Sequence, residues 1–422
     1  MSQRTSSRGH PQAAALLEIA GWAIGRARTV ADDPSGFYAE ICERIAAAGV
    51  PLARSTLHVR FYHPEFRAIT LRWADAGPSD VVPRYHPYEI EFEPGFINSP
   101  VYWIYGGAER FRRHLENPEV VLDFDVLSDL KSDGFTDYVA ERLPFIDGSN
   151  HAITWATRRP GGFSAADMDF LSALAPHLGV IFEVRADRRI AEALLRAYLG
   201  GDAATRVLKG EVRRGSGQTI EAAILFADVR NFTEMSEALP GDQVIGFLND
   251  YFESVIAPVE DHGGEVLKLI GDGLLAIFPL HRGGPRPACL AALAAARAAF
   301  ANLAELNRRR VAAGASPMRI GISLHIGKLI YGNIGGASRL DFTVIGPAVN
   351  LVGRLQSLCR KFGKGMLLTA AFAKEAGIPA VSLGHHALRG VAEPQEVFAL
   401  PPSEDPYYEP RTQSGEVWSV RR

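Results

Sequence analysis

Two aspartates in the C-terminal half of the chain stand where a sheet could bring their carboxylates together. Asp228 ends an apolar run in FADVRNFT, and Asp272 lies in the Gly-Asp-Gly turn of LKLIGDGLLAIF. Both lie at predicted strand ends, and neighbouring strand ends would place the two carboxylates over one space. Paired carboxylates favour a hard divalent cation, and with a triphosphate they suit two-metal chemistry. Taken singly, each aspartate also fits an ordinary turn or strand-end cap.

The residues after Asp228 are a second candidate. Phe232 and Thr233 open the next helical region. Backbone N–H groups at a helix start bind phosphate oxygens. The same pattern occurs at any helix start, so these two residues do not define a phosphate site alone.

Three further polar residues lie in segments that are otherwise apolar or helical. Lys268 is four residues before Asp272 on an apolar strand, where it either reaches solvent or faces an anionic or hydrogen-bonding partner. Lys268 and Asp272 share a face of the strand only if no bulge intervenes. Asn350 and Arg354 are spaced i, i+4 and share one helix face, where an amide and a guanidinium can hold a ribose and a phosphate. A solvated face is the common alternative for such a pair.

The elements that must position these residues predict a ferredoxin-like α+β domain over 218–401. Their order is strand, helix, strand, strand, helix, strand, followed by additional elements. Glycines end the first helix and form the tight hairpin turn around Asp272. The predicted strands are 219–227, 265–270, 274–278, 318–326, 328–334, 341–345, 366–369 and 395–400, and the helices are 241–260, 287–313 and 347–362.

The three motifs together resemble a known family. FADVRNFT, KLIGDGLLAIF and TVIGPAVNLVGRL, in this order and spacing, are similar to the class III adenylyl and guanylyl cyclases over about 219–400. The resemblance implies that Asp228 and Asp272 bind two Mg²⁺ or Mn²⁺ ions per site and that Lys268 recognises the base. It also implies that Asn350 orients the ribose and that Arg354 stabilises charge on the transferring phosphoryl group.

The family has a second base-selecting position seven residues before the asparagine, which is Thr343 in this chain. Many mammalian-type members have aspartate there, and Asp341, two residues out of register, is the second choice. Lysine with threonine is similar to the ATP-selective subgroup called class IIIb. Guanylyl cyclases tend to have glutamate at the lysine position.

The implied activity is that of an adenylyl cyclase, which converts ATP into 3′,5′-cyclic AMP and pyrophosphate. The family also implies a homodimer, in which the metal-binding residues of one protomer face Lys268, Thr343, Asn350 and Arg354 of the other. A guanylyl or mixed-specificity cyclase and a non-catalytic nucleotide-binding regulator are the alternatives. A diguanylate cyclase is disfavoured, because GGEVLKLIGDG lacks the corresponding signature.

The first part of the chain predicts a second α+β domain over 13–163, which resembles a divergent GAF-type sensor. Five scattered histidines and an aromatic cluster leave a small-molecule or ion effector of this domain open, although core or surface positions account for them as well. The histidines are His63, His86, His114, His151 and His177, and the aromatic residues are Tyr102, Trp103 and Tyr105. The expected helices are 13–27, 34–48 and 108–116, and the strands are 55–62, 68–73, 89–93, 100–105, 137–144 and 151–157.

A connecting helix and linker over 164–217 should join the two domains. Ser164 with Asp167 three residues later predicts a capped helix start. The apolar periodicity runs on to Tyr198, which suits pairing with a second copy of the same helix. We expect disordered tails at 1–12 and 402–422.

Composition excludes several classes of protein. The 422 residues carry a formal net charge of −3, which does not favour nucleic acid or anionic lipid as a partner. Three widely spaced cysteines indicate neither a disulfide framework nor a zinc ribbon. The polar N-terminus has no signal-peptide core, and no uninterrupted apolar window reaches the length of a membrane span. The sequence therefore predicts a cytoplasmic protein without a membrane span.

Overall fold

The computed structural model describes residues 11–29, 33–75 and 83–407. The chain divides into two compact units, Met1–Leu194 and Leu195–Arg422. The first helix begins at Pro11, so the predicted tail 1–12 overlaps its first two residues, and the rest of that tail lies outside the described residues. Cys42, Cys289 and Cys359 are free and buried.

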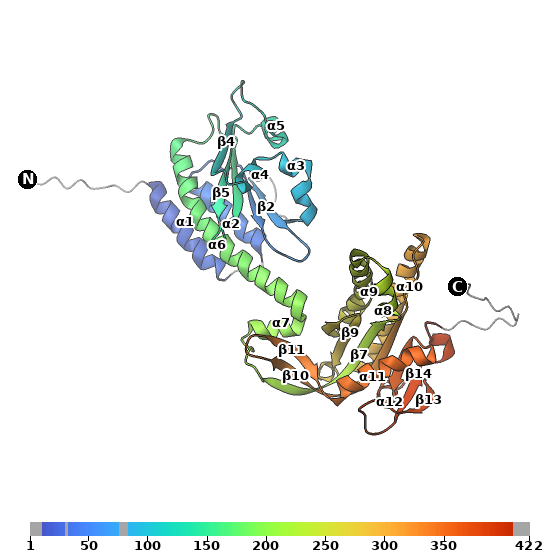
Figure 1. The fold of residues 1–422 in the computed structure, drawn as a ribbon. Helices are drawn as coiled ribbons and strands as arrows, with labels where there is room; N and C mark the ends of the chain where they lie inside the picture. The colour runs from blue at the N-terminus through green and yellow to red at the C-terminus, as the bar shows by residue number, and fades with distance from the viewer. Residues whose placement is uncertain (1–10, 30–32, 76–82, 408–422) are drawn as a thin grey trace, which may run out of the picture. The chain divides into compact units, whose positions relative to one another are not determined.

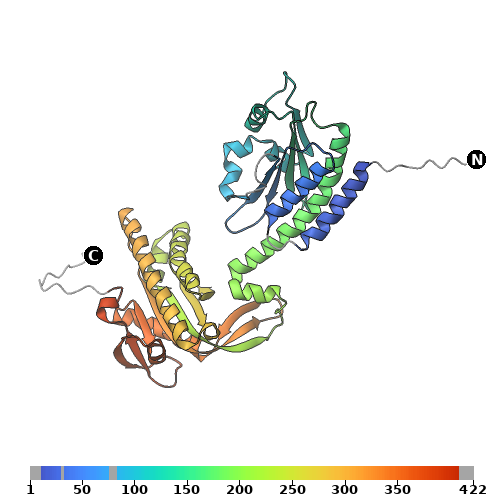
Figure 2. The ribbon, with the colours of Figure 1, turned by 180° about the vertical axis from the view of Figure 1, so that it is seen from behind.

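The N-terminal unit is a six-stranded antiparallel sheet in the order β3-β2-β1-β6-β5-β4. Helices α1, α2 and α6 cover one face, where alternate strand residues such as Leu57, Leu71 and Trp155 form the main core (Figures 1 and 2). Helices α4 and α5 cover the other face over β4 and β5. The strands are Arg54–Arg60 (β1), Ala68–Ala74 (β2), Arg84–His86 (β3), Arg110–His114 (β4), Asp137–Pro144 (β5) and Asn150–Thr157 (β6), and the helices are Pro11–Ala27 (α1), Pro34–Ala47 (α2), Tyr88–Phe92 (η1), Pro94–Ile97 (α3), Pro100–Tyr105 (α4), Asp125–Ser132 (α5) and Ala165–Leu199 (α6).

Three segments of this unit differ from the sequence prediction. The sequence predicts strands at 89–93 and 100–105, but 89–92 are in the 3₁₀ helix η1, Glu93 follows it, and 100–105 form the helix α4. The Ser99 side chain accepts a hydrogen bond from the backbone N–H of Tyr102 and so caps α4. Residues 108–116, expected as a helix, contain strand β4, which pairs with β5 and directs Arg112 at the buried Asp137, 2.7 Å away. The α+β character and the strands at 137–144 and 151–157 are confirmed.

Helix α6 begins as the sequence predicted. The Ser164 hydroxyl accepts from the backbone N–H of Asp167, and the Asp167 carboxylate accepts from the backbone N–H of Ser164. The Arg159 guanidinium lies 2.5 Å from the same carboxylate. The first half of the predicted connector is therefore part of the N-terminal core, to which Leu171, Leu174 and other apolar residues up to Phe182 contribute.

The C-terminal unit has an eight-stranded sheet in the order β13-β14-β12-β10-β7-β9-β8, with β11 paired to β10. The segment β10-β7-β9-β8, with α9 and α10 as its two crossover helices, is the predicted ferredoxin-like arrangement. Helices α9 and α10 pack on one face, and α7 and α11 pack on the other (Figure 1). The strands are Gly217–Val229 (β7), Glu265–Ile270 (β8), Gly273–Pro279 (β9), Ile320–Gly335 (β10), Leu340–Ile345 (β11), Met366–Thr369 (β12), Val381–His386 (β13) and Gln395–Ala399 (β14), and the helices are Gly201–Leu208 (α7), Phe232–Ala238 (α8), Gly241–Asp261 (α9), Leu280–Arg282 (η2), Pro285–Ala312 (α10), Pro347–Phe362 (α11), Ala370–Ala376 (α12) and Pro402–Glu404 (η3).

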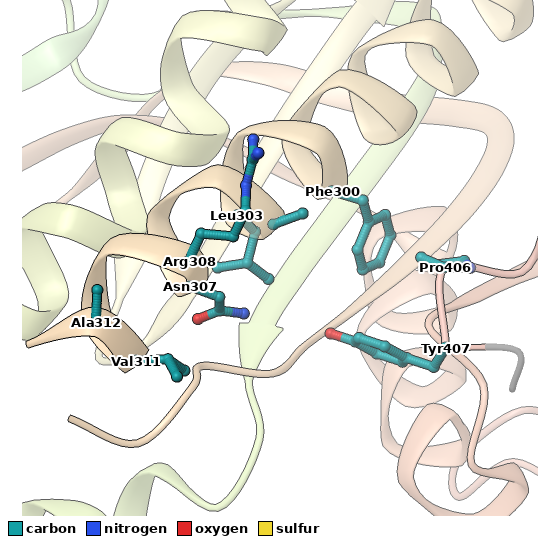
Figure 3. A pocket seen from close by; sticks show the side chains of 9 residues that line it. Phe300, Leu303, Asn307, Arg308, Val311, Ala312, Pro406 and Tyr407 are labelled. Atoms are coloured by element: carbon teal, nitrogen blue, oxygen red, sulfur yellow. The ribbon is translucent and has the colours of Figure 1, made fainter. Parts of the chain in front are cut away.

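The prediction of a disordered tail over 402–422 is wrong for its first six residues, which pack against the rest of the C-terminal unit. The Tyr407 hydroxyl accepts a hydrogen bond from the backbone N–H of Ile320 and donates to the Ile320 carbonyl, at 2.7 and 3.0 Å. Its ring packs edge-on against Phe300 of α10. Figure 3 shows Tyr407 and Pro406 facing α10 across a cavity of about 620 Å³. Residues 402–407 are thus part of the fold, and 408–422 lie outside the described residues.

Two of the described helices, α6 and α10, are long and apolar enough to cross a membrane by length and composition. The sequence analysis expected no such segment. About half of the apolar window of each helix is buried inside the structure. In α10 the buried side chains, among them Cys289, Leu293 and Leu303, belong to the core against the sheet. Core helices of globular domains pass the same test, so this property alone does not identify a span.

Candidate active site

Backbone register brings Asp228 and Asp272 together. Asp228 is the penultimate residue of β7 and pairs with Gly273, the first residue of β9. Because Ile270 also pairs with Gly273, only Gly271 and Asp272 connect β8 to β9. Gly271 has φ +63°, which the two-residue turn requires and which a side chain would disfavour. The tight turn therefore holds the Asp272 carboxylate next to Asp228.

The pKa of Asp228 differs from that of an ordinary exposed aspartate. Burial, together with the hydrogen bond and the charge of Asp272, raises the pKa of Asp228 to about 8. The Asp228 Oδ1 atom is buried and has no hydrogen-bond partner among the described residues. A buried oxygen without a donor is costly, and a divalent cation would compensate it. The two carboxylates therefore fit a metal site.

The protein alone does not complete such a site. Within the described residues no cluster of three or more His, Cys, Asp or Glu side chains could hold a metal ion. Two carboxylates are a partial ligand set for Mg²⁺, which commonly keeps waters and takes substrate phosphates as further ligands. The arrangement suits metal ions that arrive with a phosphorylated ligand.

Tyr251 lies in this region and is not among the candidate site residues of the sequence analysis. It lies on α9, and its hydroxyl is buried without a hydrogen-bond partner among the described residues. Burial and the charges of Asp228 and Asp272 raise its pKa well above the usual value. The hydroxyl therefore stays protonated beside the carboxylate pair. The i, i+4 pattern of α9 predicts the burial of Tyr251 but carries no signal for these neighbours.

Lys268 forms an ion pair with Asp341 across β8 and β11. A bulge in β8 lies between Val266 and Lys268, before the lysine, and the pairing from Lys268 to Ile270 is regular. Thr343 is two residues beyond Asp341 on β11, hence on the same strand face, and only 8% of it is exposed. The lysine and both candidate base-selecting residues thus lie in one region, and the lysine contacts the second-choice residue, Asp341.

Asn350 and Arg354 lie on α11 and are both exposed. Neither side chain has a hydrogen-bond or ion-pair partner among the described residues. Within one chain, no side-chain hydrogen bond or ion pair of the described part joins them, or Lys268, to the Asp228–Asp272 pair. The predicted residues therefore form separate groups in a single copy of the chain.

Phe232 and Thr233 are the first residues of the seven-residue helix α8. Asn231 before them has φ +60°, and no side chain caps the helix start. Phe232 packs against the core, whereas Thr233 is exposed. The left-handed Asn231 turns the chain sharply after β7, so the start of α8 follows closely on Asp228.

Comparison with known proteins assigns this unit. The family described as the adenylate and guanylate cyclase catalytic domain matches residues 216–367. An adenylate cyclase of Anabaena cylindrica is 33% identical over 165 residues, which are 39% of this chain and 32% of that protein. The terminal-differentiation-specific adenylate cyclase of Dictyostelium discoideum is 34% identical over 147 residues, 35% of this chain and 7% of that protein. The chain carries a class III cyclase catalytic domain.

Among solved structures, the adenylyl cyclase CyaB from P. aeruginosa is 26% identical, with 44% of this chain and 96% of that chain covered and a TM-score of 0.41. This chain spans about a third or less of the two curated relatives given above. The family match lies wholly within the C-terminal unit.

The cyclase domain exposes apolar side chains near the candidate residues. Leu269 and Ile270, just before the Asp272 turn, are 46% and 50% exposed. On β10 and β11, Ile330 and Ile345 are paired cross-strand neighbours and are 46% and 47% exposed. The cross-strand pair of Ile330 and Ile345 places two exposed apolar side chains side by side, and a contiguous apolar patch is typical of a surface that another protein covers.

Proposed function

We propose that this protein is an adenylyl cyclase that converts ATP into 3′,5′-cyclic AMP and pyrophosphate at the interface of a homodimer. One observation carries the proposal. In a cyclase catalytic domain, Asp228 and Asp272 are held together at a strand end and a tight turn, and one buried carboxylate oxygen has no hydrogen-bond partner in the described part of the chain. A pair arranged in this way is destabilising unless cations occupy it.

Asp228 and Asp272 would hold two Mg²⁺ or Mn²⁺ ions, which when bound supply charge neutralisation of the triphosphate and acidification of the ribose hydroxyl. The ribose 3′-oxygen attacks the α-phosphorus, and pyrophosphate leaves. Arg354 stabilises the charge that develops on the transferring phosphoryl group, and Asn350 orients the ribose. Phe232 and Thr233 present backbone N–H groups to the phosphates.

Lys268 and Thr343 would select the base. The lysine ammonium only donates hydrogen bonds, so it pairs with the N1 acceptor of adenine and opposes the N1–H donor of guanine. A threonine hydroxyl can accept a hydrogen bond from the exocyclic amine of adenine. The ion pair with Asp341 holds Lys268 in place, which supports a fixed ammonium at this position. ATP selectivity and the class IIIb subgroup follow from this assignment.

The homodimer is proposed because a single chain does not bring all the candidate site residues together. Asn350 and Arg354 are exposed, and within the described residues no side-chain hydrogen bond or ion pair joins them to the carboxylate pair of the same chain. The exposed apolar side chains of Ile270, Ile330 and Ile345 are available to a partner surface. A symmetric dimer places the Asn350–Arg354 face of one protomer over the carboxylates of the other and forms two equal sites. Within this proposal the N-terminal unit is a cytoplasmic, GAF-type regulatory domain.

Product identification tests the proposed function. The purified full chain is incubated with ATP or GTP, each with Mg²⁺ or Mn²⁺, and the nucleotides are separated by chromatography. The proposal predicts cyclic AMP and pyrophosphate from ATP and a much slower conversion of GTP. Cyclic GMP as the main product would identify a guanylyl cyclase. Nucleotide binding without turnover would identify a regulator, and either result contradicts the proposal.

A further inference from the structure

One face of the N-terminal sheet is basic. On β1, Arg54, Thr56, His58 and Arg60 alternate with residues that pack into the main core, so these four side chains share the opposite face. The neighbouring strands continue the pattern. Thr56 pairs with Arg72 of β2, and Thr70 of β2 pairs with Arg84 of β3.

This face lines a cavity of about 690 Å³, which the segment from η1 to α4 also borders. Figure 1 shows α3 and α4 beside β2. The volume is in the range of small-molecule pockets. Among the described residues that line it are five arginines and two acidic residues, Glu91 and Glu93. The arginines are Arg54, Arg60, Arg67, Arg72 and Arg84.

A fixed hydrogen-bond network forms the floor of the cavity. The His58 Nε2 and Nδ1 atoms lie 2.8 and 3.1 Å from the hydroxyls of Thr56 and Thr70. The Thr70 hydroxyl also lies 2.9 Å from the His86 Nε2 atom. Burial is the main cause that lowers the pKa of His58 to about 3, so the ring is neutral at physiological pH. The floor is therefore ordered and polar without adding charge.

The arginines at the two ends of the cavity differ in their partners. Arg67 donates to Glu91 at 2.6 Å, and Arg60 stacks over the Tyr105 ring at 4.3 Å. Arg54, Arg72 and Arg84, in contrast, have no hydrogen-bond or ion-pair partner among the described residues.

The unpaired arginines lie close together. Arg54 and Arg72 are diagonal neighbours on β1 and β2, and Arg72 and Arg84 are diagonal neighbours on β2 and β3. Arg54 is also half-buried, and its burial and the charge of Arg72 lower its pKa. Three neighbouring arginines without an ion-pair partner among the described residues are poised to bind an anion.

We propose that this cavity binds a small organic or inorganic dianion whose carboxylate or phosphate oxygens are held by Arg54, Arg72 and Arg84. Guanidinium groups bind carboxylates and phosphates through paired N–H donors. Three guanidinium groups carry more positive charge than one carboxylate neutralises, so a dianion fits this site better than a monoanion. The neutral hydroxyls and imidazoles of the floor supply the remaining hydrogen bonds. This binding site is independent of the cyclase chemistry in the C-terminal unit.

Isothermal titration calorimetry on the full chain, without metal or nucleotide, tests the proposal. The multiply charged probes are succinate, citrate and inorganic phosphate, and acetate is the monoanionic comparison. Binding of succinate or citrate would identify a carboxylate ligand, and binding of inorganic phosphate would identify a phosphate ligand. We expect one of the three probes to saturate at one molecule per chain, with acetate binding much more weakly. No saturable binding by any of the three overturns the proposal.

Variants locate the bound probe. Arg54→Gln and Arg72→Gln should each weaken binding by about tenfold or more, as expected for the loss of a charge-assisted hydrogen bond. Arg54→Lys, which keeps the charge, should retain part of the affinity. Arg113→Gln is the matched control. Arg113 lies on β4, at the opposite edge of the sheet, and forms an ion pair with Asp123. Equal affinity of Arg54→Gln, Arg72→Gln and wild type, or an equal loss in Arg113→Gln, contradicts the assignment. If Arg54→Gln does not fold, Arg72→Gln still tests the assignment, because Arg72 is exposed and its replacement should leave the fold intact.

Discussion

Asp228 and Asp272 lie so close that Asp272 raises the pKa of Asp228, and within the described part of the chain neither carboxyl group forms an ion pair with a basic residue. Two strands and a two-residue turn enforce this contact. Native proteins retain such destabilising pairs where function requires them. The pair therefore makes separable predictions about stability and about activity.

Replacing the ionisable carboxyl group of Asp228 with a neutral amide should stabilise the metal-free protein. We expect Asp228→Asn to raise the free energy of unfolding of the cyclase domain by about 1 to 2 kcal/mol in EDTA, because burial and Asp272 disfavour the carboxylate. Urea unfolding with excess EDTA measures the change. Asp261→Asn, at an exposed position on α9, is the control and should stay within about 0.5 kcal/mol of wild type. A loss of stability in Asp228→Asn would show that the carboxylate has a structural partner.

Charge reversal at Lys268 should change base selection. In Lys268→Glu the donor opposite adenine becomes an acceptor, and the ion pair with Asp341 becomes a repulsion. We expect the ratio of kcat/KM for ATP to that for GTP to fall by about tenfold or more. Lys374→Glu on the exposed face of α12 is the matched control and should keep the wild-type ratio. An unchanged ratio in Lys268→Glu removes this lysine from the base pocket.

Shared sites predict complementation between inactive chains. Asp228→Ala and Arg354→Ala should each be inactive alone, because every site of the homodimer lacks one group. After equal mixing and subunit exchange, half of the dimers are mixed and have one intact site, which gives about a quarter of the wild-type rate per dimer. Asp228→Ala mixed with Asp272→Ala is the control and should stay inactive, because each site of the mixed dimer lacks one of its two metal-binding carboxylates. Absence of recovery in the first mixture argues against shared sites.

A buried histidine makes the cyclase domain sensitive to acid. Burial lowers the pKa of His325 from its ordinary 6.5 to about 4, and its Nδ1 atom lies 2.9 Å from the Thr369 hydroxyl. Between these two pKa values the unfolded chain binds the extra proton, so stability falls as the pH drops from 6.5 toward 4. We expect this residue to contribute a loss of about 2 kcal/mol between pH 7 and pH 5.

Urea unfolding of wild type and His325→Gln at both pH values measures that contribution. The variant should lose less stability on acidification than wild type does. His385→Gln, at an exposed position on β13, is the control. Identical pH dependence in wild type and His325→Gln would show that His325 is not buried in its neutral form.

Much of the cyclase domain could be predicted from its sequence because local and long-range signals agree there. The Gly-Asp-Gly turn, the apolar β7 and the proline at the start of α11 each specify their own element. The ion pair of Lys268 with Asp341 could not be predicted in the same way, because strand alternation was uncertain until the bulge before Lys268 was located. The position of Tyr251 beside the carboxylates depends on how α9 packs, which periodicity does not determine.

The errors in the N-terminal unit have physical causes of the same kind. Residues 108–116 have good helix formers, but pairing with β5 and the ion pair of Arg112 with Asp137 favour a strand. For 100–105 a local signal was present, since Ser99 and Pro100 are typical of a helix start. The ordering of Tyr407 depends on hydrogen bonds to Ile320, which is far away in the sequence. The three unpaired arginines of the cavity, Arg54, Arg72 and Arg84, lie on separate strands, so register alone brings them together.

The most direct test of the central claim is the initial rate of cyclic AMP and pyrophosphate formation from ATP as the Mn²⁺ concentration is varied. Wild type and Asp272→Asn are compared, with Asp261→Asn as the control. The account predicts equimolar products and a saturable Mn²⁺ dependence for wild type and the control, and loss of activity at every Mn²⁺ concentration for Asp272→Asn. Turnover of Asp272→Asn at the wild-type rate, or no cyclic AMP from wild type at saturating Mn²⁺, would contradict it.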